Sequence, residues 1–159
     1  MVEIRFLADL PQHVDQLADW HHAQWHHYHA DWSHEVARAE LQSHALCRTL
    51  PTTLVLTEND VLLGSVSLLE DDAVELSAIG NAWLASLFVK PEARGRGFGA
   101  QLVNALMQHA KNIALKEIFL FTPEHAAFYR QLGWQVLQQA NVNGQKVDVM
   151  SYQIDGMAE

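Results

Sequence analysis

Three glycines and two arginines stand together in the middle of the chain, in the segment Arg94-Gly95-Arg96-Gly97-Phe98-Gly99. Glycine lets the backbone turn sharply and lets N–H groups approach a ligand without an intervening Cβ atom. The first turn of a helix adds unpaired N–H donors and a partial positive charge, and arginine can bind a phosphate with two parallel hydrogen bonds. The segment therefore predicts an anion site of the kind that holds a phosphate or pyrophosphate.

Three other interpretations compete for the same glycines. A dinucleotide-binding fold has the spacing G-x-G-x-x-G early in a βαβ unit, whereas this chain has G-x-G-x-G near its middle. A nucleoside triphosphate loop requires Gly-Lys followed by Ser or Thr, which is absent here. The glycines by themselves also fit a turn that only links a strand to a helix.

The elements that must position this segment alternate between strands and helices. A nearly continuous apolar run over 83–89 predicts a central strand covered on both faces, and Pro91 ends it. Apolar residues on one face predict a helix over 100–112. Together the elements predict an α/β fold with one mixed sheet in a single domain, 1–159. The other expected strands are 3–7, 53–57, 61–69, 117–121, 134–138 and 146–154, and the other expected helices are 11–30, one that Ser33 caps and that ends near Leu46, and 124–132.

Composition narrows the classes of function. With 10 Lys and Arg against 19 Asp and Glu, the net charge is −9, which disfavours nucleic acid as a partner and favours a cationic substrate. No apolar stretch is long enough to span a membrane, and no signal peptide is visible at the N-terminus. Cys47 is the only cysteine, so we expect a reducing cytoplasm, and we interpret Cys47 as a buried structural thiol.

Two segments resemble the motifs of the GNAT superfamily of N-acetyltransferases. The first is Val89-Lys90-Pro91 followed by Arg94 to Gly99, which matches the pattern Arg/Gln-x-x-Gly-x-Gly/Ala after an apolar strand. The second is the segment 126–134, AAFYRQLGW, which matches an aromatic residue, Tyr, three residues, Gly and an aromatic residue. The resemblance covers 3–154 and implies the GNAT acyl-CoA N-acyltransferase fold, a central mixed sheet of about seven strands flanked by four helices.

The resemblance also implies an enzyme with acetyl-CoA as co-substrate. Tyr129 would pack on the cofactor and be the general acid that protonates the departing thiolate, and the backbone of Leu87 and Val89 would pair with the pantetheine arm where two strands separate. The N–H of Leu87 or Phe88 would polarise the thioester carbonyl. Arg94 would start the loop, and the backbone N–H groups that would hold the pyrophosphate belong to Gly95, Arg96, Gly97, Phe98, Gly99 and Ala100.

The chain departs from the family at the general base. Many members carry a carboxylate on the strand before the loop, but residues 83–86 are Trp-Leu-Ala-Ser. Ser86 could hold a catalytic water but is no strong base, so Glu75, Glu124 and His125 remain candidates and the base stays open. Because the amine attacks the thioester directly, no covalent enzyme intermediate is needed and Cys47 has no expected role.

Residues 20–34, WHHAQWHHYHADWSH, concentrate histidine and tryptophan. His22 and His26 share a helix face at a spacing that can bind a metal, but we expect no metal. We expect the histidines of this helix to face water while its aromatic face packs on the sheet. In the family the first two helices line the acceptor pocket. Trp25, Tyr28 and Trp32 would then bind the substrate and, with Asp31, attract a cation.

The sequence therefore predicts an N-acetyltransferase that moves the acetyl group from acetyl-CoA to a primary amine, with a cationic small molecule as the expected acceptor. Two alternatives stay open: an N-terminal peptide or protein acetyltransferase, and a non-catalytic acyl-CoA-binding sensory domain. A homodimer is possible, with 146–154 as the pairing edge.

Overall fold

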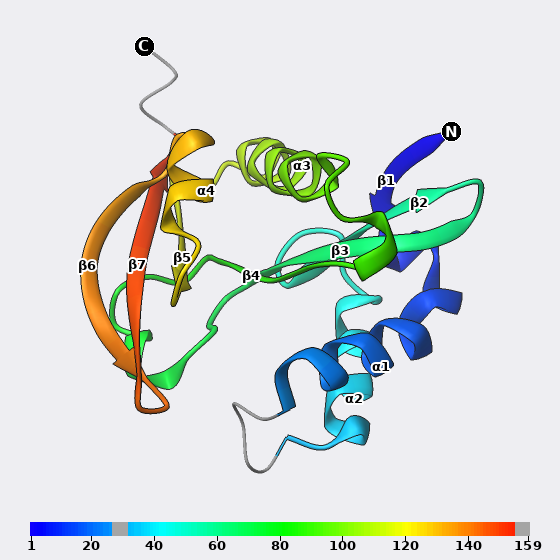
Figure 1. Ribbon diagram of the computed structural model, residues 1–159, viewed down its shortest axis with the longest axis horizontal. Helices are drawn as coiled ribbons and strands as arrows, with labels where there is room; N and C mark the ends of the chain where they lie inside the picture. Colours follow the sequence, from blue (N-terminus) through cyan, green and yellow to red (C-terminus); the bar gives the residue numbers. More distant parts are fainter. Residues whose placement is uncertain (27–31, 155–159) are drawn as a thin grey trace.

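A mixed sheet of seven strands in the order β1-β2-β3-β4-β5-β7-β6 forms the centre of the computed structural model, which describes residues 1–26 and 32–154 (Figure 1). All neighbouring strands are antiparallel except β4 and β5, which are parallel. The strands are β1 (Val2–Phe6), β2 (Thr52–Glu58), β3 (Val61–Leu69), β4 (Trp83–Val89), β5 (Glu117–Thr122), β6 (Gln135–Val142) and β7 (Gln145–Gln153). The helices are α1 (Val14–Trp25), α2 (His34–His44), α3 (Phe98–Asn112) and α4 (Ala126–Gln131).

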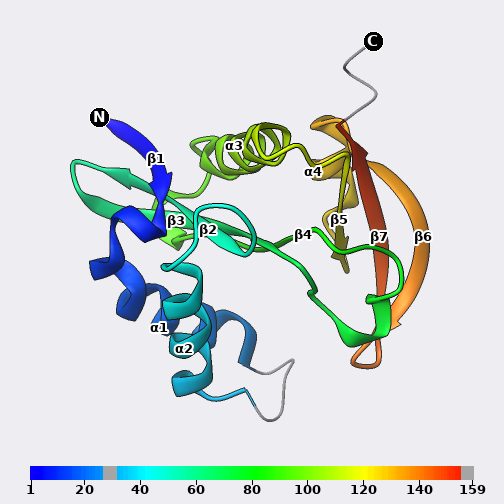
Figure 2. The same ribbon diagram turned by 180° about the vertical axis from the view of Figure 1, so that it is seen from behind.

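Helices cover both faces of the sheet. Figures 1 and 2 show α1 and α2 on one face and α3 and α4 on the other. Strand alternation produces this division, because successive side chains point to opposite faces. Leu54 and Leu56 of β2 pack in the cluster that contains α3, while Val55 between them packs with Leu17 of α1 and Leu41 of α2. One strand thus contributes to both apolar layers.

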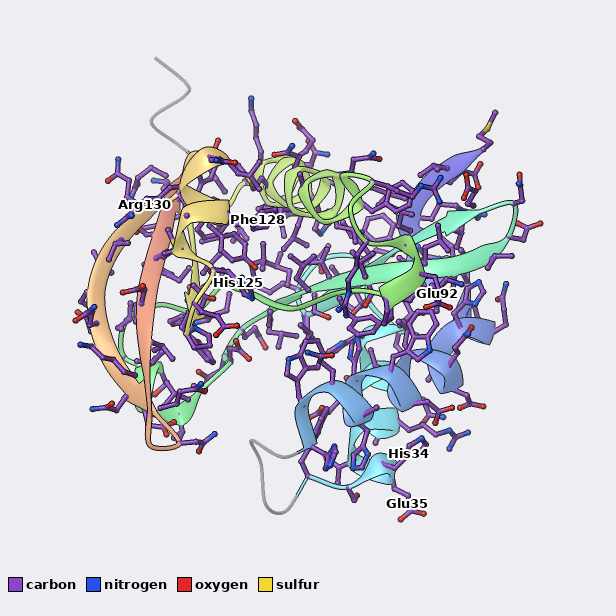
Figure 3. The ribbon with its side chains drawn as sticks, viewed as in Figure 1. His34, Glu35, Glu92, His125, Phe128 and Arg130 are labelled. Atoms are coloured by element: carbon purple, nitrogen blue, oxygen red, sulfur yellow. The ribbon has the colours of Figure 1, made fainter. Side chains whose placement is uncertain are left out.

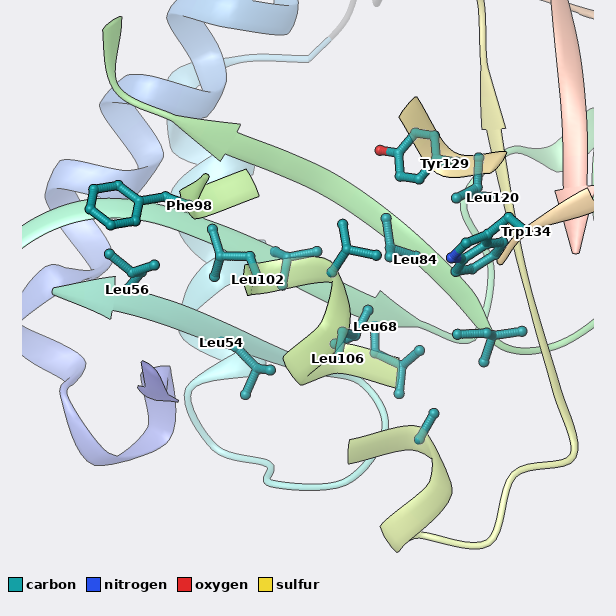
Figure 4. Close-up of a cluster of buried hydrophobic side chains, with 14 of the residues drawn as sticks. Leu54, Leu56, Leu68, Leu84, Phe98, Leu102, Leu106, Leu120, Tyr129 and Trp134 are labelled. Atoms are coloured by element: carbon teal, nitrogen blue, oxygen red, sulfur yellow. The ribbon is translucent and has the colours of Figure 1, made fainter. Parts of the chain in front are cut away.

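The larger core joins α3 to α4 through the sheet. Leu102 and Leu106 of α3 are fully buried against apolar residues of β2, β3 and β4, as Figure 4 shows. Tyr129 and Trp134 continue this cluster on the α4 side. Burying a leucine side chain stabilises the fold by about 1.5–3 kcal/mol, so this continuous cluster fixes α3 and α4 relative to the sheet.

The sheet opens between β4 and β5. Within the described residues the two strands pair only at Trp83 and Phe119, and Trp83 is fully buried at that contact. Beyond this point β4 stays with β3 and β5 stays with β7. The expected separation of the two strands is therefore present, and it exposes the backbone of the second half of β4 on one side.

A β-bulge accompanies this opening. Ser65 faces Phe88 and Ser67 faces Ala85, so Ser86 and Leu87 both stand opposite Val66. Ser86 has a φ of 56°, which L residues adopt rarely and which bends the strand where its partner is lost. The sequence analysis did not predict this bulge.

Two hairpins join β2 to β3 and β6 to β7. Asn59 and Asp60 between β2 and β3 have φ values of 52° and 67°, and Asn143 and Gly144 between β6 and β7 have 52° and 77°. Positive φ at both central residues matches the right-handed twist of the flanking strands, which explains the Asn-rich turns.

The predicted N-cap of α2 is confirmed, because the Ser33 hydroxyl accepts a hydrogen bond of 3.1 Å from the Val36 N–H.

Three sequence expectations need correction. The helix expected over 11–30 begins with a 3-10 turn at Pro11–His13, and α1 then runs over Val14–Trp25, while 27–31 lie outside the described residues. The helix expected at 100 begins at Phe98, directly after the glycines. Cys47 was expected to be buried but is half-exposed, because it lies in the turn after α2 where Thr49 bonds to its sulfur. Those hydrogen bonds lower the pKa of the Cys47 thiol.

Candidate active site

The second half of β4 offers an unpaired backbone edge. Phe88 and Val89 pair with Ser65 and Gly64 of β3 on one side, while β5 has already separated on the other. An extended ligand can hydrogen-bond along such an edge as an added strand does. The sequence prediction for Leu87, Phe88 and Val89 thus falls on a segment with the required free edge.

The glycine loop lies directly after this edge. Gly95 and Gly97 both have a φ of 82°, and nothing lies within 4 Å of the Cβ atom that a larger residue would add at either position. Gly97 is the N-cap of α3, and no side chain caps that helix. The first N–H groups of α3, beginning with Phe98 and Gly99, therefore remain available to an anion.

The two arginines of the loop differ in their contacts. Nε of Arg94 donates a hydrogen bond of 2.7 Å to the carbonyl of Val89, which ties the loop to the end of β4. Arg96 lies 4.6 Å above the Phe98 ring and forms a 3.2 Å ion pair with Glu58, which lowers the pKa of the Glu58 carboxyl. A carboxylate thus partly neutralises Arg96, whereas Arg94 has no carboxylate partner in the described part of the chain.

Tyr129 connects the second sequence motif to the opening. It is 7% exposed and packs edge-on against Phe128 and Trp134. Figure 4 shows its hydroxyl directed away from Leu120 and Trp134. Burial raises the pKa of Tyr129 to about 12, so the phenol keeps its proton throughout the neutral range.

Helix α4 also lies close to the glycine loop. Figure 3 shows Phe128 on the side of α4 that faces α3 and Arg130 on the opposite side. A Cβ atom on Gly99 would lie 3.6 Å from the Phe128 ring. The two motifs that the sequence separates by one helix and one strand therefore come together in space.

A cavity of about 1020 Å³ occupies the opening between the two halves of the sheet. Ser86 and Leu87 of β4 line it together with Tyr129. On β4 the lining of the cavity ends at Leu87, at the bulge, and the glycine loop that follows β4 is not part of it. Other described lining residues are His21, Trp25, Trp32, Glu40, His44, Glu70, Asp71, Asp72, Glu124 and His125.

The cavity wall is acidic. Five carboxylates line it, from Glu40, Glu70, Asp71, Asp72 and Glu124, and no Lys or Arg is among its described lining residues. Burial, with the neighbouring carboxylates of Asp71 and Glu40, raises the pKa of Asp72 to about 7. The arrangement can attract a cation and, at Asp72, can take up or release a proton near neutral pH.

Two histidines also line the cavity, His21 buried and His44 partly buried. His21 is 4% exposed and its Nε2 lies 3.0 Å from the Ser65 hydroxyl, while Nδ1 of His44 lies 3.0 Å from the Thr53 hydroxyl. Burial lowers the pKa of each to about 4, so both rings are neutral at neutral pH. The expectation that the histidines of α1 face water is therefore wrong for His21, which packs against Trp25 and Phe88.

Two of the three predicted acceptor residues line the cavity. Trp25 and Trp32 line the cavity, and the indole N–H of Trp32 donates a hydrogen bond of 3.1 Å to Glu40. Tyr28 and Asp31 lie outside the described residues. Gln24 of α1 lines the cavity as well, so the first two helices form one of its walls.

His22, His26 and His34 form a cluster of rings on α1 and α2, next to Trp32 of the cavity lining. The rings of His22 and His26 stack with centroids 5.0 Å apart, and His34, labelled in Figure 3, bonds to Asp19. Over 1–26 and 32–154, no group of three or more His, Cys, Asp or Glu side chains is arranged to hold a metal ion. Across the same residues, every helix is too short or too polar to cross a membrane.

The candidate bases from the sequence occupy different places. Glu75 accepts a hydrogen bond of 3.0 Å from the Asn143 N–H and is absent from the described lining of the large cavity. Glu124 and His125 do line the cavity, and their side chains lie 3.9 Å apart. Asp72, His21 and His44 were missed, because a carboxylate that ends a strand or a histidine on a helix carries no local signal of a cavity.

Comparison with known proteins adds a family match. A sequence model described as the acetyltransferase (GNAT) family matches residues 15–134. Spermine/spermidine N(1)-acetyltransferase of Bacillus subtilis (strain 168) is 35% identical over 75 residues, which make up 44% of this chain and 49% of that protein. The match thus spans about half the length of this curated relative.

Solved structures with a similar fold cover nearly the whole chain. An aminoglycoside 6'-N-acetyltransferase complexed with coenzyme A has a TM-score of 0.76 at 18% identity over 97% of both chains. A Salmonella typhimurium protein in a structure with its cofactor acetyl-CoA has a TM-score of 0.73 at 19% identity, over 99% of this chain and 96% of that one. These likenesses confirm the predicted fold.

Proposed function

Because the chain belongs to the acetyltransferase (GNAT) family, we propose that it transfers the acetyl group of acetyl-CoA directly to a primary amine of a cationic small molecule. The observation that carries this proposal is the acidic cavity that opens at the β4 bulge, beside the acetyl-CoA motif of the family. A cofactor that is an anion and an acceptor that is a cation would then approach the same point from opposite sides.

The cofactor side fits acetyl-CoA. The free edge at Leu87 and Val89 would pair with the pantetheine arm. Gly95 and Gly97 adopt the left-handed conformation and leave room for a pyrophosphate. The pyrophosphate would be held by the N–H groups of the following residues, through Gly99 and Ala100, and by the guanidinium of Arg94. When bound, acetyl-CoA supplies the activated acyl group, and the rest of the chemistry falls to this chain's own residues.

Three groups would serve the transfer. The N–H of Leu87 or Phe88, at the bulge, would donate to the carbonyl oxygen as negative charge develops there. Tyr129 would give its proton to the leaving thiolate, and its raised pKa keeps that proton in place until then. Ser86 lines the cavity at the same bulge and would hold a water molecule.

The acceptor side favours an amine with more than one positive charge. The cavity carries five carboxylates over about 1020 Å³, and Trp25 and Trp32 add aromatic rings that attract cations. The names of the compared proteins agree with this inference. Spermine, spermidine and the aminoglycosides, which the relatives' names mention, all carry several amines. Polyamines are therefore the first acceptors to test.

An amine panel tests the proposal. The protein is titrated with acetyl-CoA by calorimetry, and thiol release is then measured with polyamines, aminoglycosides, neutral amines, amino acids and peptides with a free N-terminus. We expect micromolar binding and the highest kcat/KM with polycations. Higher turnover of neutral or anionic amines would refute the cationic acceptor, and preference for peptides would favour a peptide acetyltransferase. Binding with no turnover at all would favour a sensory domain.

A further inference from the structure

We propose that Asp72 is the general base that removes a proton from the acceptor amine. The inference deepens the proposed function and rests on it. A primary ammonium cannot attack a thioester until it has lost a proton, and β4 supplies no carboxylate for this step. The structure places a carboxylate from the connection between β3 and β4 in the cavity instead.

The position of Asp72 follows from the route of the chain. After β3 the connection over 70–82 passes to the β6–β7 hairpin before it returns to β4, as Figures 1 and 2 show. There the Glu75 carboxylate accepts a hydrogen bond from the Asn143 N–H, and Leu76 is buried with Trp83 and Val142. The connection is thus anchored on the far half of the sheet, and Asp72 lines the cavity that Ser86 and Tyr129 line.

The Asp72 carboxylate is free to act. Among the described residues it has no hydrogen bond or ion pair, whereas Glu40 accepts from Trp32 and Glu75 accepts from Asn143. His21 and His44 are bound to hydroxyl groups and are weak bases, because burial lowers the pKa of each to about 4. Glu70, Asp71, Glu124 and His125 also line the cavity, but all four are exposed, whereas Asp72 is partly buried. Asp72 is therefore the partly buried carboxylate of this wall that no described group occupies.

The groups around Asp72 adjust the pKa of its carboxyl to the value that a general base needs near neutral pH. Burial and the negative charges of Asp71 and Glu40 raise the pKa of Asp72 to about 7, so near neutral pH it can both take up a proton and release it. The other titratable groups that line the cavity are His21, His44, Glu70, Glu124, His125 and Tyr129. A negative wall also favours the approach of the ammonium that Asp72 must deprotonate.

The proton balance of the reaction is complete. The ammonium carries three hydrogens, and the amide product keeps one of them. Asp72 takes the first proton and releases it to solvent through the open cavity. As the C–N bond forms and the C–S bond breaks, the nitrogen loses the second proton. Tyr129 gives its own proton to the thiolate, and the second proton from the nitrogen then passes to Tyr129 through a water molecule at Ser86. Asp72 and Tyr129 thus both return to their starting states.

The test compares the pH dependence of kcat/KM for a polyamine in the native protein and in Asp72→Asn. We expect the native protein to lose activity below about pH 7. In Asp72→Asn we expect kcat at pH 7 to fall about 100-fold and the rate to rise tenfold per pH unit, because only amine that is already neutral can react. Acetyl-CoA affinity, measured by calorimetry, should stay unchanged, which shows that the variant is folded.

Two further variants sharpen the test. Asp72→Glu keeps a carboxylate and should recover part of the lost kcat. Asp71→Asn is the matched control, since it removes one neighbouring charge from the exposed side of the same turn and should move the acid limb of the native profile to lower pH. This shift reports on the native Asp72 even if Asp72→Asn does not fold.

The outcomes separate the two proposals. If Asp72→Asn keeps kcat within about threefold and keeps the acid limb, Asp72 is not the base, and the same holds if only KM rises. An acid limb that does not move in Asp71→Asn also contradicts the assignment. If the native protein binds acetyl-CoA but turns over no amine, the proposed function itself is refuted.

Discussion

The two sides of the candidate site are built in opposite ways. The proposed cofactor side comes from one continuous segment, 87–100, and would rely mainly on backbone N–H groups. The acceptor side gathers side chains from α1, α2, the turn after β3, β4, β5 and the turn before α4. A segment that acts through its backbone can be recognised from its glycines, whereas a wall assembled from distant segments exists only in the folded chain.

Their electrostatics differ as well. The cofactor side carries Arg94 and Arg96 in a chain with a net charge of −9, and the acceptor side carries five carboxylates. Glu58 partly neutralises Arg96, so at the proposed site the backbone would contribute much of the attraction for an anion. Separation of the two kinds of charge lets one small domain favour an anionic donor and a cationic acceptor at the same time.

The largest effect is expected on the cofactor side, from Gly97→Val. Gly97 has a φ of 82°, and a β-branched residue there would shift the loop and obstruct the phosphates. We expect acetyl-CoA affinity, measured by calorimetry, to fall by about 100-fold or more. Gly144→Ala is the control, because Gly144 has a φ of 77° in the distant β6–β7 turn. Unchanged affinity in Gly97→Val would remove the basis for a backbone-made cofactor site.

The next largest effect is expected at Tyr129, which lines the cavity and belongs to the second sequence motif. Tyr129→Phe keeps the ring that packs on Phe128 and Trp134 but removes the proton donor. We expect kcat to fall about 30- to 100-fold at every pH from 6 to 9, because a pKa of about 12 keeps the native phenol protonated over that range. Tyr152→Phe, on β7, is the control. A kcat that stays within threefold of the native value would mean that the thiolate finds its proton elsewhere.

The acceptor side should also set the stability of the protein in acid. The folded-state pKa of His21 and His44 is about 4, below the unfolded value of 6.5, so folding is favoured while both rings are neutral. This stability is fully present above pH 6.5 and is lost as pH falls towards 4, by about 2 kcal/mol for each histidine.

Urea unfolding at pH 7 and pH 4.5 measures this loss. His44→Gln should reduce the difference in unfolding free energy between the two pH values, and His125→Gln, at an exposed position, should not. Equal pH dependence in the native protein and in His44→Gln would show that the buried histidines do not control acid stability.

The smallest effect is expected from single charges on the acceptor wall. Glu124→Gln should raise the KM of a polyamine about three- to fivefold at low ionic strength and less at high salt, because the carboxylate is exposed and screened. Glu117→Gln, at the other end of β5 and outside the described cavity lining, should leave KM unchanged. A KM that both variants raise equally would point to overall charge rather than to a local acceptor wall.

Local sequence patterns determined most of the fold. Sequence patterns predicted a strand near each of the seven observed strands, although β6 continues to Val142, past the expected end at 138, because its polar second half pairs with β7. The turns at Asn59-Asp60 and Asn143-Gly144 form two hairpins, and such signals depend only on neighbouring residues. The glycines after β4 indicated the anion site, and the motif around Tyr129 indicated the family. The site residues, the single domain, the cytoplasmic location and the possible dimer remain predictions.

Only the tertiary structure decided the acceptor side. The bulge at Ser86, the burial of His21 and the presence of Asp72 in the cavity depend on how β4 parts from β5 and on where the connection over 70–82 is anchored. The pKa of a side chain depends on the groups that fold around it, and for Asp72 one of these, Glu40, comes from a helix 32 positions earlier in the chain. Sequence alone specifies which groups can ionise, and folding decides at which pH they do so.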